Sequence, residues 1–240
     1  MTFTLTAATG SEQGPVRPSN QDAVLADGIL FAVSDGFGAE GEHASRIALE
    51  ALAAGFAEAP DRDGLIAAAQ LANEQVWSYV CAANPDLAGG TGATLTAVAF
   101  FDDGPVAINV GDSPLNRIRD GQMEQLTDDH SVSGELVRVG ELTRAQARLH
   151  PQRHLLTRAL GIGPRLRVDI LDVDCRPGDR LLLSSDGLFA GAEDAQVLAA
   201  AVGDTPERAV QQLIEVSNAA GGSDNTSVVV VDVAPSATCL

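Results

Sequence analysis

The amino-acid sequence predicts an α+β protein in which helices cover packed antiparallel β-sheets. Short apolar runs joined by tight turns fill residues 93–126, a pattern that is typical of an antiparallel meander. Helical segments occur in pairs, at 42–83 and 193–219, instead of following each strand. A doubly wound parallel sheet needs a crossover helix between strands, so this spacing argues against one. The 240 residues are ample for a hydrophobic core.

The first half of the chain predicts a strand, a hairpin and a helix pair. The dipeptide Asp27-Gly28 separates two apolar runs and is a strong signal for a short hairpin turn. The segments that follow are rich in Ala, Leu and Glu, and their apolar residues recur at intervals of three and four, as on one face of a helix. The expected elements are a strand at 4–8, a hairpin at 23–34 and helices at 42–58 and 63–83.

The second half of the chain predicts further strands on both sides of a polar segment, 131–160. Asp103 and Asp120 belong to plain turns between strands, and Thr143 with Gln146 offers a capping box within the polar segment. The expected strands are 93–101, 105–110, 115–119, 122–126, 168–173, 180–185 and 226–233. The expected helices are about 193–202 and 206–219, the second with Thr205 as its N-cap and Pro206 at its first position.

The composition argues against several classes of function. There are 33 acidic and 15 basic residues, and the resulting formal net charge of -18 repels nucleic acids. Cys81, Cys175 and Cys239 form no C-x-x-C motif, so neither a disulfide framework nor a zinc site is expected. The N-terminus does not read as a signal peptide, and no stretch approaches the roughly 20 apolar residues of a membrane span. We therefore expect a cytoplasmic protein without a membrane segment.

Aspartates at the ends of apolar runs are the main functional signal. Each is followed by glycine or a small polar residue, and they are Asp35, Asp112, Asp186 and Asp224. A carboxylate where a strand leaves the core costs free energy unless its charge is compensated. Their spacing fits no local calcium-binding loop, so only the tertiary fold can bring them together. Oxygen ligands suit Mg²⁺ or Mn²⁺, and the pattern therefore predicts a hydrolase with one shared cation site.

Any one of these aspartates, taken alone, is better explained as a turn residue, because Asp-Gly is a common turn dipeptide. Asp35 and Asp186 differ from plain turns since no second hairpin strand follows them. The glycines after them, Gly36 and Gly187, have no Cβ and can take positive φ angles, which would let a carbonyl or a water approach a metal closely.

The order of motifs resembles that of the PPM family, the metal-dependent type 2C serine/threonine protein phosphatases, and its bacterial members most of all. The resemblance covers about residues 4–233. The segments that carry it are GPVRPSNQD (14–22), VSDGFG (33–38), GGTGAT (89–94), NVGDS (109–113), RDGQMEQLTDDHS (119–131), LLTRALG (155–161), LLLSSDGLF (181–189) and GGSDNTSVVVV (221–231).

This resemblance implies a four-layer α-β-β-α sandwich, in which two antiparallel sheets lie between two helix pairs. It implies a single phosphatase catalytic domain over 1–240, with a flap at about 131–160 beside the active site. It also implies two core Mn²⁺ or Mg²⁺ ions and a third, weaker one. The implied ligands are Asp35 bridging both core ions, the Gly36 carbonyl, Asp186, Asp224, Asp22 through a water, and Asp112 with Asp186 for the third ion.

The same resemblance implies hydrolysis of phosphoserine and phosphothreonine in proteins. A water bridging the two ions is ionised near neutral pH and attacks phosphorus in line. Arg17 matches the arginine that grips the substrate phosphate, because its planar fork donates two parallel hydrogen bonds. Without the resemblance, Arg17 is as readily a surface arginine in a proline-flanked loop. We expect a monomer that acts in bacterial signal transduction, opposing a serine/threonine kinase.

The sequence departs from the family pattern at several positions. Gln21 replaces a glutamate near the second metal and removes a charge. Phe37 stands where certain members carry a general-acid histidine, so the leaving group must take its proton from a metal-bound water or another group. Ala39 replaces a glycine of that loop, and Pro114 replaces an arginine after the aspartate of NVGDS.

Other readings remain open at this stage. The scaffold could serve as a phosphopeptide- or metal-binding module without activity, or as a small-molecule phosphatase with the same metals. His150 and His154 are four residues apart, but Pro151 intervenes, and we expect a surface or flap role for them. The flap arginines could meet acidic phosphopeptides, although a solvated basic face explains them more simply; they are Arg144, Arg148 and Arg153.

Overall fold

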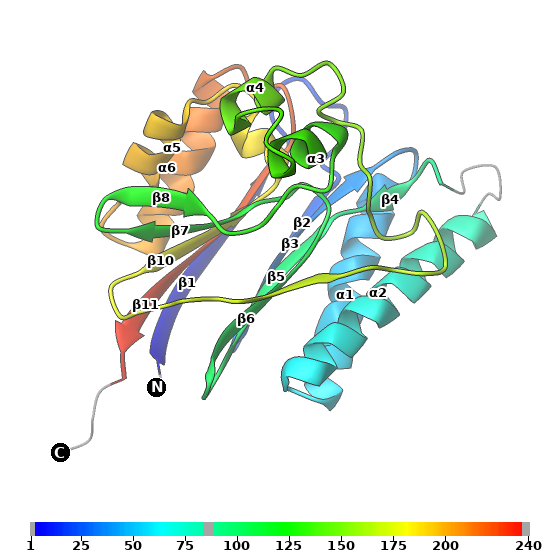
Figure 1. Cartoon of the computed structure of the whole chain (residues 1–240), viewed down its shortest axis with the longest axis horizontal. Helices are drawn as coiled ribbons and strands as arrows, with labels where there is room; N and C mark the ends of the chain where they lie inside the picture. Colours follow the sequence, from blue (N-terminus) through cyan, green and yellow to red (C-terminus); the bar gives the residue numbers. More distant parts are fainter. Residues whose placement is uncertain (1–2, 84–88, 237–240) are drawn as a thin grey trace.

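The computed structural model describes residues 3–83 and 89–236, and it contains two antiparallel sheets packed face to face between helix pairs (Figure 1). The strands are β1 (Phe3–Glu12), β2 (Asp22–Asp27), β3 (Leu30–Phe37), β4 (Gly92–Ala93), β5 (Leu95–Phe101), β6 (Gly104–Val110), β7 (Leu115–Arg119), β8 (Gln122–Gln125), β9 (Asp169–Asp172), β10 (Arg180–Ser184) and β11 (Thr226–Pro235). One sheet has the order β1-β11-β10-β7-β8, and the other has the order β2-β3-β5-β6-β9 with β4 beside β3.

The helices form a pair on each outer face and a smaller group at one edge (Figure 1). They are α1 (Gly41–Glu58), α2 (Arg62–Ala83), α3 (Val132–Arg138), α4 (Arg144–Arg148), α5 (Asp194–Ala201) and α6 (Pro206–Ala219), with the 3₁₀ helix η2 (Asp186–Phe189) after β10. The pair α1–α2 covers the sheet that contains β3, and the pair α5–α6 covers the sheet that contains β11. The expected four-layer α-β-β-α sandwich is therefore confirmed.

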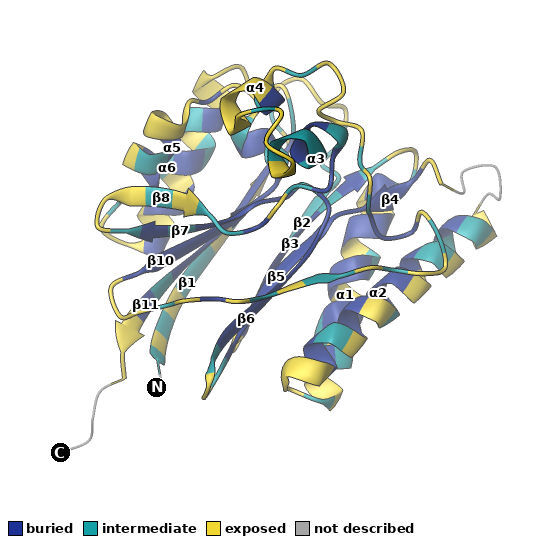
Figure 2. Cartoon of the chain, in the orientation of Figure 1, coloured by how far each residue is buried: buried dark blue, intermediate teal, exposed yellow. Residues whose placement is uncertain are grey.

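Side-chain alternation explains the continuous apolar runs at 30–33 in β3 and at 228–231 in β11. In β3, Leu30 and Ala32 pack against the α1–α2 layer, whereas Phe31 and Val33 pack between the two sheets. β11 alternates in the same way, with Val228 and Val230 toward α5–α6 and Val229, Val231 and Val233 between the sheets. Because both faces of these strands are buried, no polar face interrupts the sequence pattern (Figure 2).

The helix ends follow the expected capping chemistry. The Thr143 side chain accepts a hydrogen bond from the Gln146 backbone, and the Gln146 side chain caps Thr143 in return, which completes the capping box at α4. Thr205 caps α6 through the Arg208 backbone, and Pro206 occupies the first turn. These contacts satisfy backbone donors that would otherwise lack partners at the helix starts.

Three strands differ from the sequence-based expectation by more than two residues or by a break. β1 spans Phe3–Glu12 instead of the expected 4–8. β3 continues beyond 34 to Phe37, so Asp35 lies within the strand, paired with Asp22 of β2. The strand expected at 93–101 is divided at Thr94, because β4 pairs with the end of β3 and Ala93 also bridges to Leu160. The extension carries Asp35 to the edge of the sheet, where the flap begins.

Within the described ranges, no helix is long and apolar enough to cross a membrane. Cys81 and Cys175 are free thiols, and Cys239 lies outside the described residues.

Candidate metal and phosphate site

A cavity of about 820 Å³ opens at the edge of the sandwich where β3 ends and the flap begins. It is lined by side chains from segments that lie far apart in the sequence. Those that the sequence predicted are Arg17, Asp35, Gly36, Asp112, Asp186 and Asp224, with Gln21 and Phe37 beside them. The structure therefore brings the strand-end aspartates to one place. Asp22 is not part of the cavity wall and lies behind it, paired with Asp35 across β2 and β3.

Two hydrogen bonds with Thr94 hold the backbone of Asp35 in place. The Asp35 backbone N–H donates to Thr94 Oγ1 at 2.9 Å, and the Asp35 carbonyl accepts from the Thr94 N–H at 2.8 Å. Thr94 Oγ1 also lies 2.7 Å from Ser113 Oγ, directly after Asp112. Thr94 of GGTGAT and Ser113 of NVGDS therefore connect Asp35 with the Asp112 loop. This contact explains why a hydroxyl side chain is present in each motif.

The Asp112 loop is anchored by His130, a residue to which the sequence analysis assigned no role. His130 is 2% exposed; its Nδ1 accepts the Gly111 N–H at 3.1 Å, and its backbone N–H donates to the Gly111 carbonyl at 2.9 Å. Its Nε2 lies 3.1 Å from Asp169 Oδ2, and its carbonyl accepts the Thr157 N–H. His130 thus ties the Asp112 loop to both ends of the flap.

Asp22 is held from the side of β10 and β11. Ser185 Oγ donates to Asp22 Oδ2 at 2.7 Å, and Ser185 Oγ also accepts the Ser227 N–H at 3.0 Å. The other carboxylate oxygen of Asp22 is buried and has no hydrogen-bond partner among the residues that the structure describes. Because a buried carboxylate oxygen without a partner is costly, this atom indicates a positive or hydrogen-donating group that occupies the site in the working protein.

Arg17 and Asp224 face each other at the rim of the cavity. Arg17 Nη2 donates to Asp224 Oδ2 at 2.6 Å, and about half of the Arg17 side-chain surface is exposed. The neighbouring Asn225 fixes the Arg17 loop, because its amide donates to the carbonyls of Gln13 and Ser19 and its Oδ1 accepts the Gln21 N–H. Asn225 is a second residue that the sequence analysis missed, since an asparagine beside Asp224 reads as an ordinary turn residue.

The site carries uncompensated negative charge. Burial raises the pKa of Asp22 to about 6, against the hydrogen bond from Ser185 that lowers it. Burial also raises the pKa of Asp35 and that of Asp112 well above the usual range for aspartate, and neighbouring carboxylates add to both shifts. Carboxylates that repel one another in this way are stabilised when divalent cations bind among them.

The carboxylates of the site have the oxygen atoms that divalent cations prefer, but their positions match a shared metal site less completely. All the acidic groups offer oxygen, which Mg²⁺ and Mn²⁺ prefer, and the unpartnered oxygen of Asp22 points to the same need. Over residues 3–83 and 89–236, however, no three Asp, Glu, His or Cys side chains stand ready as a common set of ligands. Arg17 engages Asp224 and Ser185 engages Asp22, so part of the set is held by protein partners.

The chain does not use the positive φ angles that glycine would allow at Gly36 and Gly187. Neither is among the glycines with positive φ. Both are required by close packing instead. A Cβ on Gly36 would lie 2.0 Å from the Gly41 carbonyl oxygen, and a Cβ on Gly187 would lie 1.9 Å from the Asn225 carbonyl oxygen. The absence of a side chain therefore lets neighbouring backbone segments meet beside Asp35 and Asp186.

His154 lies closer to the site than expected. Its Nδ1 is 3.8 Å from Asp186 Oδ2, and it lines the cavity together with Leu155. The surface or flap role expected for His154 stays a prediction. Its approach to Asp186 was not visible in the sequence, because Pro151 breaks the helical spacing from His150.

The electrostatics of the site predict how stability depends on pH and metal. Since the pKa of Asp22 is about 6 when folded and near 3.8 when unfolded, the folded state binds more protons between these values. Stability of the metal-free protein should therefore fall as pH rises from about 4 to about 6, with Asp22 alone contributing about 3 kcal/mol. Mn²⁺ should raise the melting temperature more at pH 7.5 than at pH 5, because protons compete with the ion.

Thermal melts in chelator and in Mn²⁺, recorded over this pH window, check the prediction. Asp22→Asn is the matched variant, since its amide oxygen can still accept from Ser185 but no longer titrates. The decline of stability with pH in chelator should be smaller in this variant. Equal declines in the two proteins would contradict the assignment.

Comparison with known proteins gives a consistent result. The family model described as Protein phosphatase 2C matches residues 16–223. The serine/threonine protein phosphatase PstP of Mycobacterium tuberculosis is 37% identical over 238 residues, which is 97% of this chain but 46% of PstP. The chain thus spans about half the length of that curated relative. A putative 2C-type protein phosphatase of Streptococcus pyogenes is 32% identical, with 91% of this chain and 93% of the relative covered.

Solved structures agree with these relatives. The PPM Ser-Thr phosphatase MsPP from Mycobacterium smegmatis, in complex with cacodylate, is 63% identical with a TM-score of 0.91, and 95% of this chain and 97% of that chain are covered. The catalytic domain of PstP in complex with two manganese ions is 33% identical with a TM-score of 0.85, covering 98% and 100%. The family model spans most of the chain and these similarities extend over nearly all of it, so the chain belongs to the protein phosphatase 2C family.

Proposed function

We propose that the chain is a metal-dependent phosphoprotein phosphatase that hydrolyses phosphoserine and phosphothreonine esters. The observation that carries this proposal is the cavity in which the carboxylates of Asp35, Asp186 and Asp224 lie with the guanidinium of Arg17. Carboxylates suit divalent cations and a guanidinium suits phosphate, so one cavity offers partners for both. The relatives named as protein phosphatases support the same reaction.

The proposed ligands are those expected from the sequence. Two core ions, Mn²⁺ or Mg²⁺, would be held by Asp35, the Gly36 carbonyl, Asp186 and Asp224, with Asp22 in support and with Asp112 and Asp186 for a third ion. The two manganese ions in the related PstP domain support two core ions here. When bound, such ions acidify a water molecule and neutralise charge on the phosphate.

The chain's own residues would bind and orient the phosphoester. Arg17 stands half exposed at the rim, and its planar fork can donate two hydrogen bonds to phosphate oxygens. Asn225 orients the loop that carries Arg17, through its contacts with Gln13, Ser19 and Gln21. Phe37 lines the cavity and has no proton to give, so protonation of the leaving group falls to water or another group.

The proposal includes partners. The substrates would be phosphorylated proteins, and a bacterial serine/threonine kinase would supply the phosphorylation that this enzyme removes. We further propose that residues 1–240 act as one phosphatase catalytic domain, with 131–160 as its flap. That the chain is a cytoplasmic monomer stays a prediction.

Hydrolysis of three substrates tests the proposed function. Phosphothreonine and phosphoserine peptides and p-nitrophenyl phosphate are incubated with the protein in Mn²⁺ and in chelator, and phosphate release is measured. We expect release from both peptides in Mn²⁺ and none in chelator. Turnover of p-nitrophenyl phosphate alone would indicate a small-molecule phosphatase. No turnover of any substrate at saturating Mn²⁺ would indicate a binding module.

Arg17→Lys tests the role of the guanidinium. Lysine keeps the charge but loses the fork, so we expect kcat/KM for a phosphothreonine peptide to fall by about tenfold, the scale of one charge-assisted hydrogen bond. The control is Arg46→Lys, an exposed arginine of α1 that pairs with Glu50 and does not line the cavity. Equal kcat/KM in Arg17→Lys and wild type would refute the assignment.

A further inference from the structure

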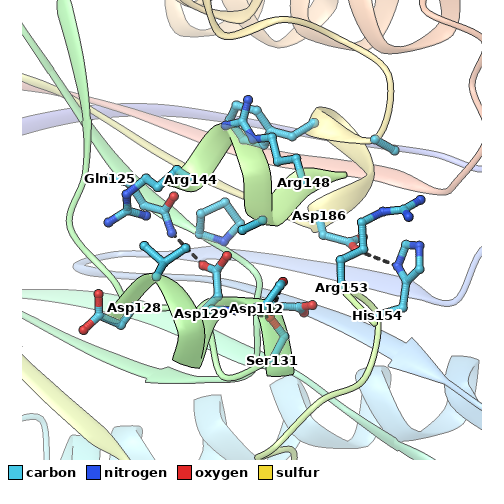
Figure 3. Close-up of a pocket in the computed structure, with 17 residues that line it drawn as sticks. Asp112, Gln125, Asp128, Asp129, Ser131, Arg144, Arg148, Arg153, His154 and Asp186 are labelled. Atoms are coloured by element: carbon cyan, nitrogen blue, oxygen red, sulfur yellow. Dashed lines mark hydrogen bonds and ion pairs between the residues drawn. The ribbon is translucent and has the colours of Figure 1, made fainter. Parts of the chain in front are cut away.

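A second, smaller cavity of about 110 Å³ lies beside the first, between the flap and η2 (Figure 3). Its walls come from α3, α4, the segment after α4, and η2. Asp112, His154 and Asp186 line both cavities, so the two are continuous at these residues. A peptide whose phosphate lies in the larger cavity would therefore pass this smaller one with its neighbouring residues.

Arginines from the flap form the basic part of this wall; they are Arg144, Arg148 and Arg153. Figure 3 shows Arg144 and Arg148 on one helix of the flap, with Arg153 beside His154. We call the cavity lined by these three residues the arginine pocket. In a chain with a net charge of -18, three basic side chains around one small cavity are unusual enough to need an explanation.

The three arginines differ in what they contact. Arg148 is committed to the protein, because it forms an ion pair with Asp194 and its guanidinium lies 4.9 Å from the centre of the Phe189 ring. The side chains of Arg144 and Arg153 form no hydrogen bond or ion pair with any residue in 3–83 or 89–236. Two guanidiniums with unused donors therefore remain at the pocket.

The acidic groups of the pocket accept no hydrogen bond from these donors, although Asp129 lies within electrostatic range of Arg144 and Arg148. Asp129 Oδ1 accepts from Gln125 Nε2 at 2.6 Å (Figure 3), and Asp128 is exposed at the surface. Asp112 and Asp186 belong to the proposed metal site. Once cations occupy that site, Arg144 and Arg153 still have hydrogen-bond donors that neither Asp128 nor Asp129 uses, and these donors can bind an incoming anion.

We propose that the arginine pocket binds a second anionic group of the substrate peptide, a carboxylate or a second phosphate near the phosphoresidue, through Arg144 and Arg153. This inference rests on the proposed function and deepens it, since it defines the class of phosphopeptide that is preferred. It replaces the interpretation of these arginines as a solvated basic face, because they line a cavity continuous with the proposed catalytic one.

Matched phosphothreonine peptides test this inference. The peptides are identical except at one neighbouring position, scanned along the peptide, which holds Gln, Glu, phosphoserine or Lys. With the Mn²⁺-loaded wild type, kcat/KM should be about fivefold higher for Glu or phosphoserine than for Gln at one position, the scale of a partly exposed ion pair. A preference for phosphoserine alone identifies a second phosphate as the ligand, and a preference for Glu identifies a carboxylate.

Two variants and one control give the decisive comparison. In Arg144→Gln/Arg153→Gln the ratio of kcat/KM for Glu and Gln peptides should fall to about one, and in Arg144→Glu/Arg153→Glu the Lys peptide should become the preferred one. Such a reversal is not expected from a loss of flap structure. The control Arg138→Gln removes an exposed flap arginine that pairs with Glu135 and does not line the pocket, so the wild-type ratio should persist.

Two results would overturn the inference. One is a wild-type ratio near one at every scanned position, and the other is a preference that survives in the double variants or disappears equally in Arg138→Gln. Failure of the proposed function is a separate result. It would appear as no Mn²⁺-dependent turnover of p-nitrophenyl phosphate, which has no second anion.

Discussion

Replacing Asp35 by asparagine should lower Mn²⁺-dependent turnover by about a thousandfold while the protein stays folded. Asp35 is the carboxylate whose pKa is raised by burial and by four other aspartates: Asp22, Asp186, Asp112 and Asp224. Asparagine keeps the size of the side chain but removes the charge that would hold the ions. The loss corresponds to about 4 kcal/mol, within the several kcal/mol that a bound metal contributes to charge stabilisation.

The same substitution should have the opposite effect on the metal-free protein. Removing one of several repelling carboxylates should raise the melting temperature in chelator, whereas the additional stabilisation by Mn²⁺ should largely disappear. Turnover assays and thermal melts with and without Mn²⁺ measure both effects. Asp27→Asn is the control, because Asp27 lies in the turn of the same β2–β3 hairpin, where asparagine is equally suitable. Full activity in Asp35→Asn would exclude Asp35 as a ligand.

Gly36→Ala should destabilise the protein and abolish activity together. The added Cβ would lie 2.0 Å from the Gly41 carbonyl oxygen and 2.7 Å from the Gln21 carbonyl oxygen, and backbone atoms on both sides must move to admit it. We expect a loss of about 3 kcal/mol or more in the free energy of unfolding, and a melting temperature lower by about 10 °C. Denaturant titration and thermal melting measure these quantities.

Gly163→Ala is the matched control for this substitution. No heavy atom lies within 4 Å of a Cβ built on Gly163, and its φ angle is not positive. This variant should melt close to wild type and keep its activity. If Gly36→Ala behaves like Gly163→Ala, then close backbone packing is not the reason for glycine beside Asp35.

The layers of the fold were predictable because their physical causes are local. Leu30 to Val33 is apolar at every position, since alternate side chains enter different core layers. Thr143 and Thr205 mark helix starts because their hydroxyls accept from backbone donors three residues further on. The gathering of Asp35, Asp186 and Asp224 at one cavity could also be predicted, because their charges need a common partner.

Residues that act through tertiary contacts could not be predicted. His130 receives its role from Gly111, Asp169 and Thr157, which become its neighbours only when the flap folds against the Asp112 loop. The packing requirement at Gly36 likewise depends on the path of the chain at Gly41. Neither contact can be predicted from the sequence pattern, because each joins segments that only the fold brings together.

The arginine pocket illustrates the same limit for charged side chains. In sequence, Arg144 and Arg153 resemble any exposed basic residues of a polar segment. Their significance depends on the shared wall of two cavities, formed by Asp112, His154 and Asp186. Only the docking of the flap beside η2 creates that wall.

Diffraction from crystals grown with Mn²⁺, recorded at the manganese absorption edge, tests the central claim most directly. The account predicts two strong anomalous peaks in the larger cavity, both within direct coordination distance of the Asp35 carboxylate, with Asp186 and Asp224 as further ligands. Anomalous peaks only outside this cavity, in a protein that still hydrolyses phosphothreonine peptides in Mn²⁺, would contradict it.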